Sequence, residues 1–332
     1  MMPCCLLLQI DSYLMRLPLR KDDLAFARAT ARRLAAFEAN VHPLPGLRAE
    51  NAEATFIFQI VESIRRIRFV QQISNREIAQ SRKSPASEYF DPIRGAMLYF
   101  QEGDIDEASW LVFLFVHFGK HAKSGYQLIR DVYGKFGNGR IWTWTNVSSD
   151  PMAFRHWLDK NQLKLRATEA QHRGFGNHRK YQSLHAWKPV GTGEAVHTYV
   201  LWVLSSGSHA KLFATAANAS KGDPEKSFGY LYREMKVVKS FGRTARFDYL
   251  AMIGKLKLAD IHPDSVHFDG ATGPVTGARL LFSGNPQSRD SAKSLESLSD
   301  LLASRLSVGK QVIEDSLCNW QKSPSNPIRF RG

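Results

Sequence analysis

The pattern of hydrophobic and polar positions along the chain predicts helices almost throughout. Between residues 54 and 73, apolar side chains recur every three or four positions, and three arginines fall mostly outside the apolar stripe. Residues 24–37 repeat Ala, Leu and Arg at helical spacing, and the sequence HPLPGL after them breaks this helix, so an N-terminal helical appendage is expected to end near residue 48. The predicted fold class is therefore mostly α.

A central buried helix is expected in the segment EGDIDEASWLVFLFVHFGKH. Asp104 can cap its first turn, Glu107 can reach back to the same turn, and Gly119 can end the helix. Because its apolar residues run around the whole circumference, this helix should lie in the middle of the core.

Three further segments complete the predicted organisation. Ser149, Asp150 and Pro151 mark the start of another helix. The passage HTYVLWVL, residues 197–204, is β-branched and aromatic enough to favour a strand, although a buried helical turn has the same composition. Residues 294–320 predict a long C-terminal helix, with a bend at Gly309 as an option.

Length and composition place the chain among ordinary globular proteins. Its 332 residues suffice for a main domain over 51–332, preceded by an N-terminal helical appendage over 1–50. Three cysteines without a CxxC pair make a disulfide framework or a zinc site improbable and favour the cytoplasm. The opening apolar residues lack the basic start of a signal peptide, and no run is long enough to span a bilayer.

The net charge narrows the choice of partner. Lys and Arg number 45 against 31 Asp and Glu, a formal charge of +14. Such an excess attracts polyanions, nucleic acid first among them, although basic enzymes with small substrates share it.

The segment GFGNHRKY combines two glycines with polar and cationic side chains. Arg179 and Lys180 can hold phosphate oxygens, Asn177 can donate a hydrogen bond, and His178 can exchange a proton. The spacing fits neither a P-loop nor a dinucleotide-binding fingerprint. A phosphate clamp and a solvated surface turn are both compatible with the segment.

A second basic segment, LYREMKVVKSFGRTARFDYLAMIGKLK, predicts two helices joined by a tight turn at residues 240–245. Backbone N–H groups at Gly242 and Thr244 would open the second helix, with Arg243 and Arg246 beside them. Such a hairpin can grip a DNA phosphate without reading bases. The plain alternative is a pair of packed helices whose arginines only neutralise nearby carboxylates.

Two other groups are candidates for chemistry. Asp269, in the loop before the helix through residues 277–280, can act on a nucleophile or simply cap that helix. His117 and His121 have the spacing of metal ligands, but no third ligand is identifiable near them. No metal or organic cofactor is indicated.

Taken in order, six motifs resemble one family, the clade 3 alpha-glutamyl/putrescinyl thymine pyrophosphorylases. They are FDPIRGAM (90–97), DEASWLVFLFVHFGKH (106–121), GFGNHRKY (174–181), FGRTARFDYL (241–250), ATGPVTGARLLF (271–282) and EDSLCNWQK (314–322). The resemblance covers about residues 60–332, and the combination is specific although no single motif is.

The resemblance implies a fold similar to the helix-hairpin-helix DNA glycosylases. It also implies an enzyme of DNA base hypermodification, in which an amine of the glutamate or putrescine type displaces pyrophosphate from a pyrophosphorylated 5-hydroxymethyl pyrimidine. Asp269, His178 and Asp248 would be catalytic, and Lys322 would join the phosphate-binding residues. The sequence FGRTA lacks the first glycine of the glycosylase hairpin, with Ser240 or Phe241 in its place, which puts its phosphate grip in doubt.

Acting on a base within a duplex requires its extrusion into a pocket. Trp110, Trp142, Trp144 and Tyr181 are candidates to replace the lost stacking, although most tryptophans are simply core residues. The expected partners are DNA and a small amine. Two alternatives stay open: a glycosylase-like enzyme or defence factor that recognises modified bases, and a non-catalytic DNA-binding module.

Overall fold

The computed structural model describes residues 12–17, 19–166, 173–176, 179 and 182–327. These residues are mostly α-helical, and the one β contact among them is an isolated bridge between His121 and Gly125. The predicted mostly-α class is confirmed. Within the same residues, no helix has the length and apolar character needed to cross a membrane.

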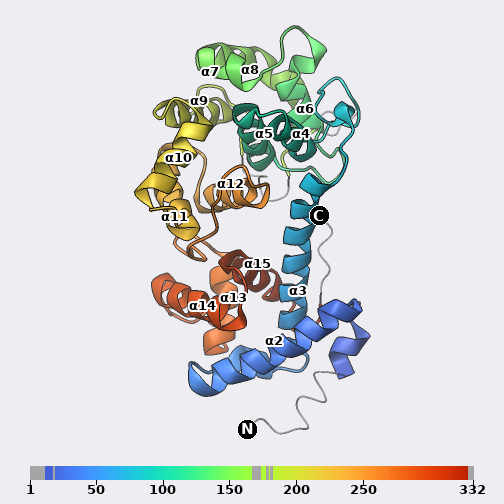
Figure 1. Cartoon of the computed structure of the whole chain (residues 1–332), viewed down its shortest axis with the longest axis vertical. Helices are drawn as coiled ribbons and strands as arrows, with labels where there is room; N and C mark the ends of the chain where they lie inside the picture. Colours follow the sequence, from blue (N-terminus) through green and yellow to red (C-terminus); the bar gives the residue numbers. More distant parts are fainter. Residues whose placement is uncertain (1–11, 18, 167–172, 177–178, 180–181, 328–332) are drawn as a thin grey trace. The chain divides into compact units, whose positions relative to one another are not determined.

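The chain forms two compact units, whose residue ranges can be located in Figure 1 from its colour bar. Unit 1 combines residues 1–69 with 263–332, and unit 2 comprises residues 70–262. Each unit encloses a hydrophobic core of its own.

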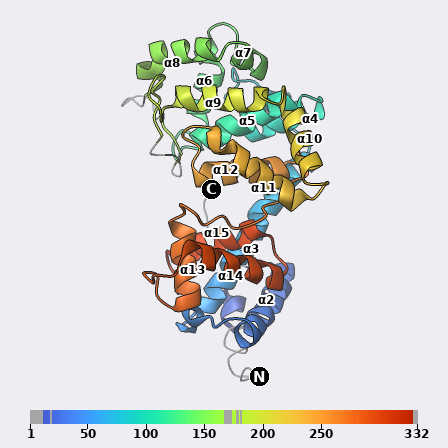
Figure 2. The ribbon, with the colours of Figure 1, turned by 90° about the vertical axis from the view of Figure 1, so that its left-hand side faces the viewer.

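Unit 1 joins the two ends of the chain. Its helices are α2 (Lys21–Asn40), most of α3 (Ala52–Gln71), α13 (Gly273–Ser283), α14 (Ala292–Leu306) and α15 (Lys310–Trp320), seen again in Figure 2. The indole N–H of Trp320 donates to the carbonyl oxygen of Ala52 at 3.0 Å, and the Trp320 ring packs edge-on to Phe56 at 5.3 Å. This buried contact fixes α15 against α3.

Helix α2 confirms the helix predicted over residues 24–37 and contributes to the core of unit 1. Leu34 and Phe37 are buried there, and Phe37 lies 6.5 Å from Phe282 between ring centroids. A guanidinium N–H of Arg33 also donates to the carbonyl oxygen of Leu306 at 2.6 Å. The boundary expected at residue 50 stays a prediction.

The C-terminal region differs from its prediction. Instead of one helix over 294–320 there are two, α14 and α15, separated at Ser307–Gly309. Ser307 adopts a left-handed backbone with φ of 55°, and a residue in that conformation ends an α-helix. The break is therefore complete and lies two residues before the glycine at which a bend was considered.

Unit 2 packs its helices around α5. Its helices are α4 (Pro92–Gln101), α5 (Ile105–Phe118), α6 (Gln127–Tyr133), α7 (Trp144–Ser149), α8 (Pro151–Leu165), α9 (Thr192–Leu204), α10 (His209–Ala219), α11 (Pro224–Glu234) and α12 (Arg243–Lys255). Residues 110–114 of α5 are wholly buried, as expected for a helix that is apolar on all sides.

The predicted helix starts are confirmed in unit 2. The Asp104 carboxylate accepts from the backbone N–H of Glu107 at 2.9 Å, and Asp150 caps α8 in the same way. Gly119, with φ of 70°, ends α5. Glu107 does not complete a capping box, because its carboxylate accepts hydrogen bonds from Tyr133 and Trp144 instead.

The strand reading of residues 197–204 is wrong, because this segment belongs to helix α9. Its β-branched and aromatic residues are buried against neighbouring helices, and tertiary packing of this kind overrides local propensity. The hydroxyl of Thr198 donates to the carbonyl oxygen of Glu194, a bond within the helix.

Candidate functional site

The two motif segments centred on Arg179 and Gly242 meet in unit 2. Arg179 is 8% exposed, and its Nη2 lies 2.6 Å from Oδ2 of Asp248 on α12. Its Nε donates to the carbonyl oxygen of Val116, near the end of α5, also at 2.6 Å. The guanidinium therefore links α5 to α12 and holds the carboxylate of Asp248, whose side chain is 43% exposed.

The glycines of GFGNHRKY have a packing role in the structure. Gly176 donates its N–H to the carbonyl oxygen of Phe118 at 2.7 Å. A Cβ on Gly176 would come within 2.9 Å of the backbone of Lys120, and one on Gly174 would lie 3.2 Å from the His121 ring. The glycines thus let the segment approach the end of α5. Asn177, His178, Lys180 and Tyr181 lie outside the described residues.

A short turn connects α11 to α12 and is held from several sides. The carbonyl oxygen of Ser240 accepts from the side-chain amide of Gln182 at 3.2 Å, and the N–H of Lys239 donates to Thr198 at 2.9 Å. The Phe241 ring stacks on Phe113 of α5 at 4.8 Å. The predicted helix, turn and helix are confirmed, and we refer to residues 238–242 as the hairpin.

Gly242 is the exposed N-cap of α12 and has no side-chain cap. Its φ of −67° suits any residue, and a Cβ added there would meet no atom within 4 Å. Neither the backbone nor the packing requires glycine at this position. The absence of a side chain instead leaves the first turn of α12 open to a ligand.

The arginines of the hairpin region fold back onto their own unit. Arg243 is buried with its guanidinium over the Phe247 ring, at 4.9 Å from the centroid. Arg246 donates to the carbonyl oxygen of Tyr232 at 2.9 Å and lies over that ring. Thr244 is exposed on the first turn of α12. Lys239, which motif matching passed over, is an exposed cation within the hairpin.

Asp269 and Lys322 belong to unit 1, whereas the Arg179–Asp248 pair belongs to unit 2. Asp269 is exposed in the loop before α13, whose N-cap is Thr272 without a side-chain bond, so Asp269 is not the cap of that helix. Lys322 is exposed, and its Nζ donates to Oδ1 of Asn319 at 3.1 Å.

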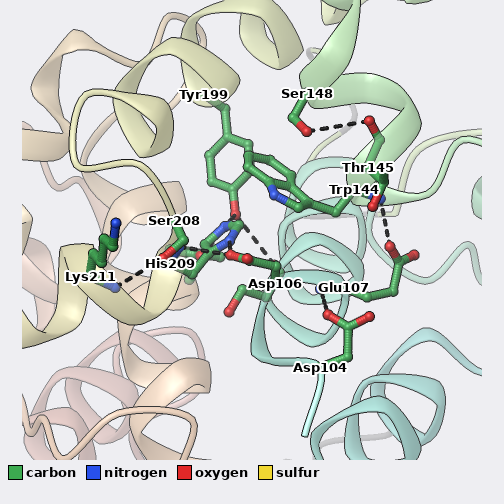
Figure 3. A network of polar contacts seen from close by, with 12 residues as sticks. Asp104, Asp106, Glu107, Trp144, Thr145, Ser148, Tyr199, Ser208, His209 and Lys211 are labelled. Atoms are coloured by element: carbon green, nitrogen blue, oxygen red, sulfur yellow. Dashed lines mark hydrogen bonds and ion pairs between the residues drawn. The ribbon is translucent and has the colours of Figure 1, made fainter.

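A chain of hydrogen-bonded polar groups, which sequence reasoning missed, runs from the partly exposed Asp106 into the core of unit 2 (Figure 3). Asp106 on α5 accepts from both the backbone N–H and the Nδ1 of His209, at 2.7 and 2.6 Å. The Nε2 of His209 lies 2.6 Å from the Tyr199 hydroxyl, which in turn lies 3.0 Å from the hydroxyl of Tyr249. Tyr249 follows Asp248 directly, so the chain fixes α12 beside the candidate carboxylate.

Burial governs the protonation of this chain. His209 is completely buried, which lowers its pKa although Asp106 opposes the shift. Burial alone would raise the pKa of Asp106, but the hydrogen bonds from His209 lower it below the ordinary value. Burial also raises the pKa of Tyr199. A neutral imidazole can therefore relay one hydrogen bond between an aspartate and a tyrosine hydroxyl.

Glu107 is a second buried acid on α5. It accepts from the Tyr133 hydroxyl and from the backbone N–H of Trp144, each at 2.5 Å. Burial raises its pKa to about 7, in spite of these two hydrogen bonds. Its carboxyl group ties α5 to α6 and α7.

The histidine pair at His117 and His121 gives no metal site. The Nε2 of His117 lies 2.9 Å from the Thr192 hydroxyl, and burial lowers the pKa of His117 to about 3. His121 bonds to Ser124 instead. Over the part of the chain that the structure describes, no group of three or more His, Cys, Asp or Glu can hold a metal ion.

The tryptophans considered for base stacking are core residues. Trp110, Trp142 and Trp144 are all at most 7% exposed, and Trp110 donates its indole N–H to the carbonyl oxygen of Trp142. Cys318 packs beside Gly273, where a Cβ would lie 2.8 Å from its Sγ. The three tryptophans build the interior, and Cys318 is partly buried.

Comparison with known proteins gives one match. A family model described as alpha-glutamyl/putrescinyl thymine pyrophosphorylase clade 3 matches residues 51–332. This span contains every motif segment discussed above. No curated protein and no solved structure matches the chain.

Proposed function

The chain belongs to the clade 3 alpha-glutamyl/putrescinyl thymine pyrophosphorylases, and from that premise we propose that it is a transferase acting on a modified thymine base in DNA. The observation that carries the proposal is the Arg179–Asp248 pair beside the hairpin. It joins a half-exposed carboxylate to an element suited to hold a DNA phosphate. The family name supports the class of base, and the geometry supports the choice of Asp248 and Arg179.

The proposed reaction exchanges an amine for pyrophosphate at the exocyclic carbon of a pyrophosphorylated 5-hydroxymethyl pyrimidine. The amine nitrogen forms a bond to the CH₂ carbon while the C–O bond breaks, and pyrophosphate leaves with the electron pair. The nitrogen then loses a proton to a carboxylate. Asp248 is the first candidate for this base, and Asp269 the second, with His178 as a candidate proton donor to the leaving group.

Charge on the leaving pyrophosphate needs cationic groups close by. Lys180 is the proposed donor, with Asn177 as a further hydrogen-bond donor. Lys322, which belongs to unit 1, is a separate candidate for a contact with a DNA phosphate. Arg179 already binds Asp248 and the Val116 carbonyl, so its contacts support a role in orienting the carboxylate. A phosphate contact from Arg179 stays a prediction.

We further propose that α11, the hairpin and α12 form the DNA-binding element of a glycosylase-like helix-hairpin-helix fold. The exposed N-cap at Gly242 supports this, because backbone N–H groups at a helix start bind phosphate. Ser240, with φ of 59°, has the left-handed backbone that glycine adopts easily, so the turn is made without the glycine missing from the motif. The target base would be extruded for the reaction.

The test uses a duplex with one pyrophosphorylated 5-hydroxymethyluracil, offered with glutamate, putrescine and a mixture of other amines. After digestion to nucleosides, mass spectrometry should show a nucleoside carrying the amine, with release of one pyrophosphate per product. Release of a free base would instead identify a glycosylase, and an unchanged substrate would support a non-catalytic DNA-binding module.

A further inference from the structure

A rigid, exposed loop precedes helix α9 in unit 2. Four consecutive residues, Trp187, Lys188, Pro189 and Val190, are exposed, and we call them the 187–190 tip. Trp187 is 43% exposed and Val190 67%. This is the opposite of the core tryptophans, since the indole here reaches solvent and has a lysine next to it in sequence.

The base of the tip is fixed against the start of α9. The N–H groups of Thr192 and Gly193 donate to the carbonyl oxygens of Ser183 and His185, at 2.8 and 3.1 Å. Gly191 and Gly193 pack so closely that a Cβ on either would lie within 2.2 Å of a carbonyl oxygen of the loop. Pro189 further limits the backbone. The tip is therefore a preformed projection.

The indole of Trp187 is also held in place. The guanidinium of Arg155 lies over its ring at 4.7 Å from the centroid, and the His156 ring meets it edge-on at 5.0 Å. Arg155 itself is fixed, because it donates to the carbonyl oxygen of Ala186 at 2.9 Å and pairs with Glu194 at 2.8 Å. The entropy cost of ordering the side chain is thus met before any ligand binds.

We propose that Trp187 is a stacking platform for an unpaired nucleobase of the DNA substrate, with Lys188 contacting an adjacent phosphate. The proposal rests on the proposed function for the identity of the ligand as DNA. A half-exposed indole with a guanidinium over its ring and an exposed lysine next in sequence matches a ligand that is flat, apolar on its face and anionic at its edge, and a nucleotide has all three properties. Every base offers such a face, so the platform would act without sequence preference.

An unpaired base is the expected partner because the reaction itself would create one. Extruding the target base leaves its partner without a pair, and stacking on an aromatic ring offsets part of that cost. A paired base inside a duplex has both faces covered by its neighbours and offers no surface to an indole. The tip should therefore strengthen the binding of DNA that contains an unpaired base, and it should add little to the binding of an intact duplex.

The test compares three fluorescently labelled DNAs: an intact duplex, the same duplex with one bulged thymine, and a single strand. Anisotropy titrations use the full chain and the variants Trp187→Ala and Trp187→Phe. The control is Leu163→Ala, which removes a more exposed apolar side chain, 73% exposed against 43% for Trp187, on α8 of the same unit. Circular dichroism and thermal midpoints verify that each variant is folded.

Trp187→Ala should weaken binding to bulged and single-stranded DNA by about tenfold and leave the duplex nearly unchanged. Trp187→Phe should retain most of the affinity, and Leu163→Ala should behave as the unsubstituted chain. A 2-aminopurine placed at the bulge should be quenched on binding, and this quenching should disappear in Trp187→Ala.

Other results would contradict the proposed role of Trp187. Unchanged affinity of Trp187→Ala for bulged DNA, together with loss of binding in Gly242→Asp, would leave the hairpin and the proposed function standing without it. No binding of the unsubstituted chain to any DNA would remove both. Binding to phosphatidylserine vesicles that depends on Trp187, with DNA binding unaffected, would assign the tip to a membrane surface.

Discussion

Asp248 combines two properties that a general base requires. Its side chain reaches solvent, and the buried Arg179 fixes its position through a contact of 2.6 Å. Asp269 shares the exposure but lies in a loop of unit 1, before a helix α13 whose N-cap Thr272 makes no side-chain cap bond. On local geometry, the fixed carboxylate is the better placed of the two for proton transfer.

Replacing Asp248 by Asn should separate catalysis from folding. The amide keeps the shape and an acceptor for Arg179 but cannot accept the amine proton, so turnover should fall by about 10²- to 10⁴-fold. Because the Asp248 side chain of the pair is 43% exposed, the free energy of unfolding should change by only about 1 kcal/mol. Product formation by mass spectrometry and the urea midpoint measure the two effects.

Two further variants sharpen this result. Asp159→Asn, an exposed acid on α8, should leave both quantities unchanged. If Asp248→Asn kept full activity and Asp269→Asn lost it, the role of general base would be assigned to Asp269. A large loss of stability in Asp248→Asn would make the residue structural.

Glu107 makes stability depend on pH. Its pKa is raised to about 7 in the folded state, against 4.5 as the ordinary value, so the folded chain binds the proton more tightly than the unfolded chain. The contribution of Glu107 to the free energy of unfolding should therefore decrease as pH rises from about 4.5 to 7, by up to about 1.4 kcal/mol per pH unit, and then level off.

Glu107→Gln should remove this part of the pH dependence. The amide is neutral at every pH, whereas Glu107 ionises in its buried position as pH rises through about 7, so the stability of the variant relative to the unsubstituted chain should increase between pH 5 and pH 8. Urea unfolding at pH 5, 6, 7 and 8 tests this, with the exposed Glu88→Gln as the control. A constant difference over that range would contradict it.

At the scale of elements, the hairpin is held by contacts on its inner side, while Gly242 at its end is exposed. Phe241 anchors it to α5, and Lys239 to α9 through Thr198. Gly242 projects no side chain from the start of α12. The contacts that hold the turn are thus internal, and its exposed side consists of the Gly242 backbone and the Lys239 side chain.

Gly242→Ala should fold normally and bind DNA less well. The added methyl meets no protein atom within 4 Å, so the unfolding free energy should stay within about 0.5 kcal/mol of the unsubstituted value. It would separate a phosphate from the N–H groups of the first turn, and we expect a loss of about tenfold in affinity for duplex DNA, measured by anisotropy.

A glycine of the opposite kind gives the contrast. A Cβ on Gly277 of α13 would lie 2.3 Å from the carbonyl oxygen of Leu317, so Gly277→Ala should lower the thermal midpoint sharply. Equal affinity for DNA in Gly242→Ala and the unsubstituted chain would argue against a phosphate at the hairpin.

At the scale of the whole molecule, the two ends of the chain share one core in unit 1. The family match begins at residue 51, yet Leu34, Phe37 and Leu44 before it are each about 1% exposed within that core. Residues outside the matched span therefore contribute to the stability of residues within it.

A chain shortened to residues 51–332 should be much less stable than the full chain. Each large apolar side chain removed from the core loses about 1.5–3 kcal/mol of burial, and the surface that they cover on α13 and α14 would be exposed. Calorimetry should show a lower transition for unit 1, and the truncated chain should bind a hydrophobic dye. An unchanged transition would support the expected independent appendage over residues 1–50.

The sequence by itself determined the local features of this protein. Helix caps at Asp104 and Asp150, the helical class and the turn before Gly242 were predictable, because each depends on residues within a few positions of one another. The family was identifiable from ordered motifs for a similar reason, since each motif is a short continuous string.

Only the tertiary structure decided what depends on distant neighbours. Residues 197–204 form a helix because their burial outweighs their β propensity. Arg179 meets Asp248 across 69 positions, and Asp106 meets His209 across 103. The spacing of such residues in the sequence carries no information on contacts that packing creates. The motif therefore makes Asp248 a candidate, but only the fold shows that Arg179 is its partner.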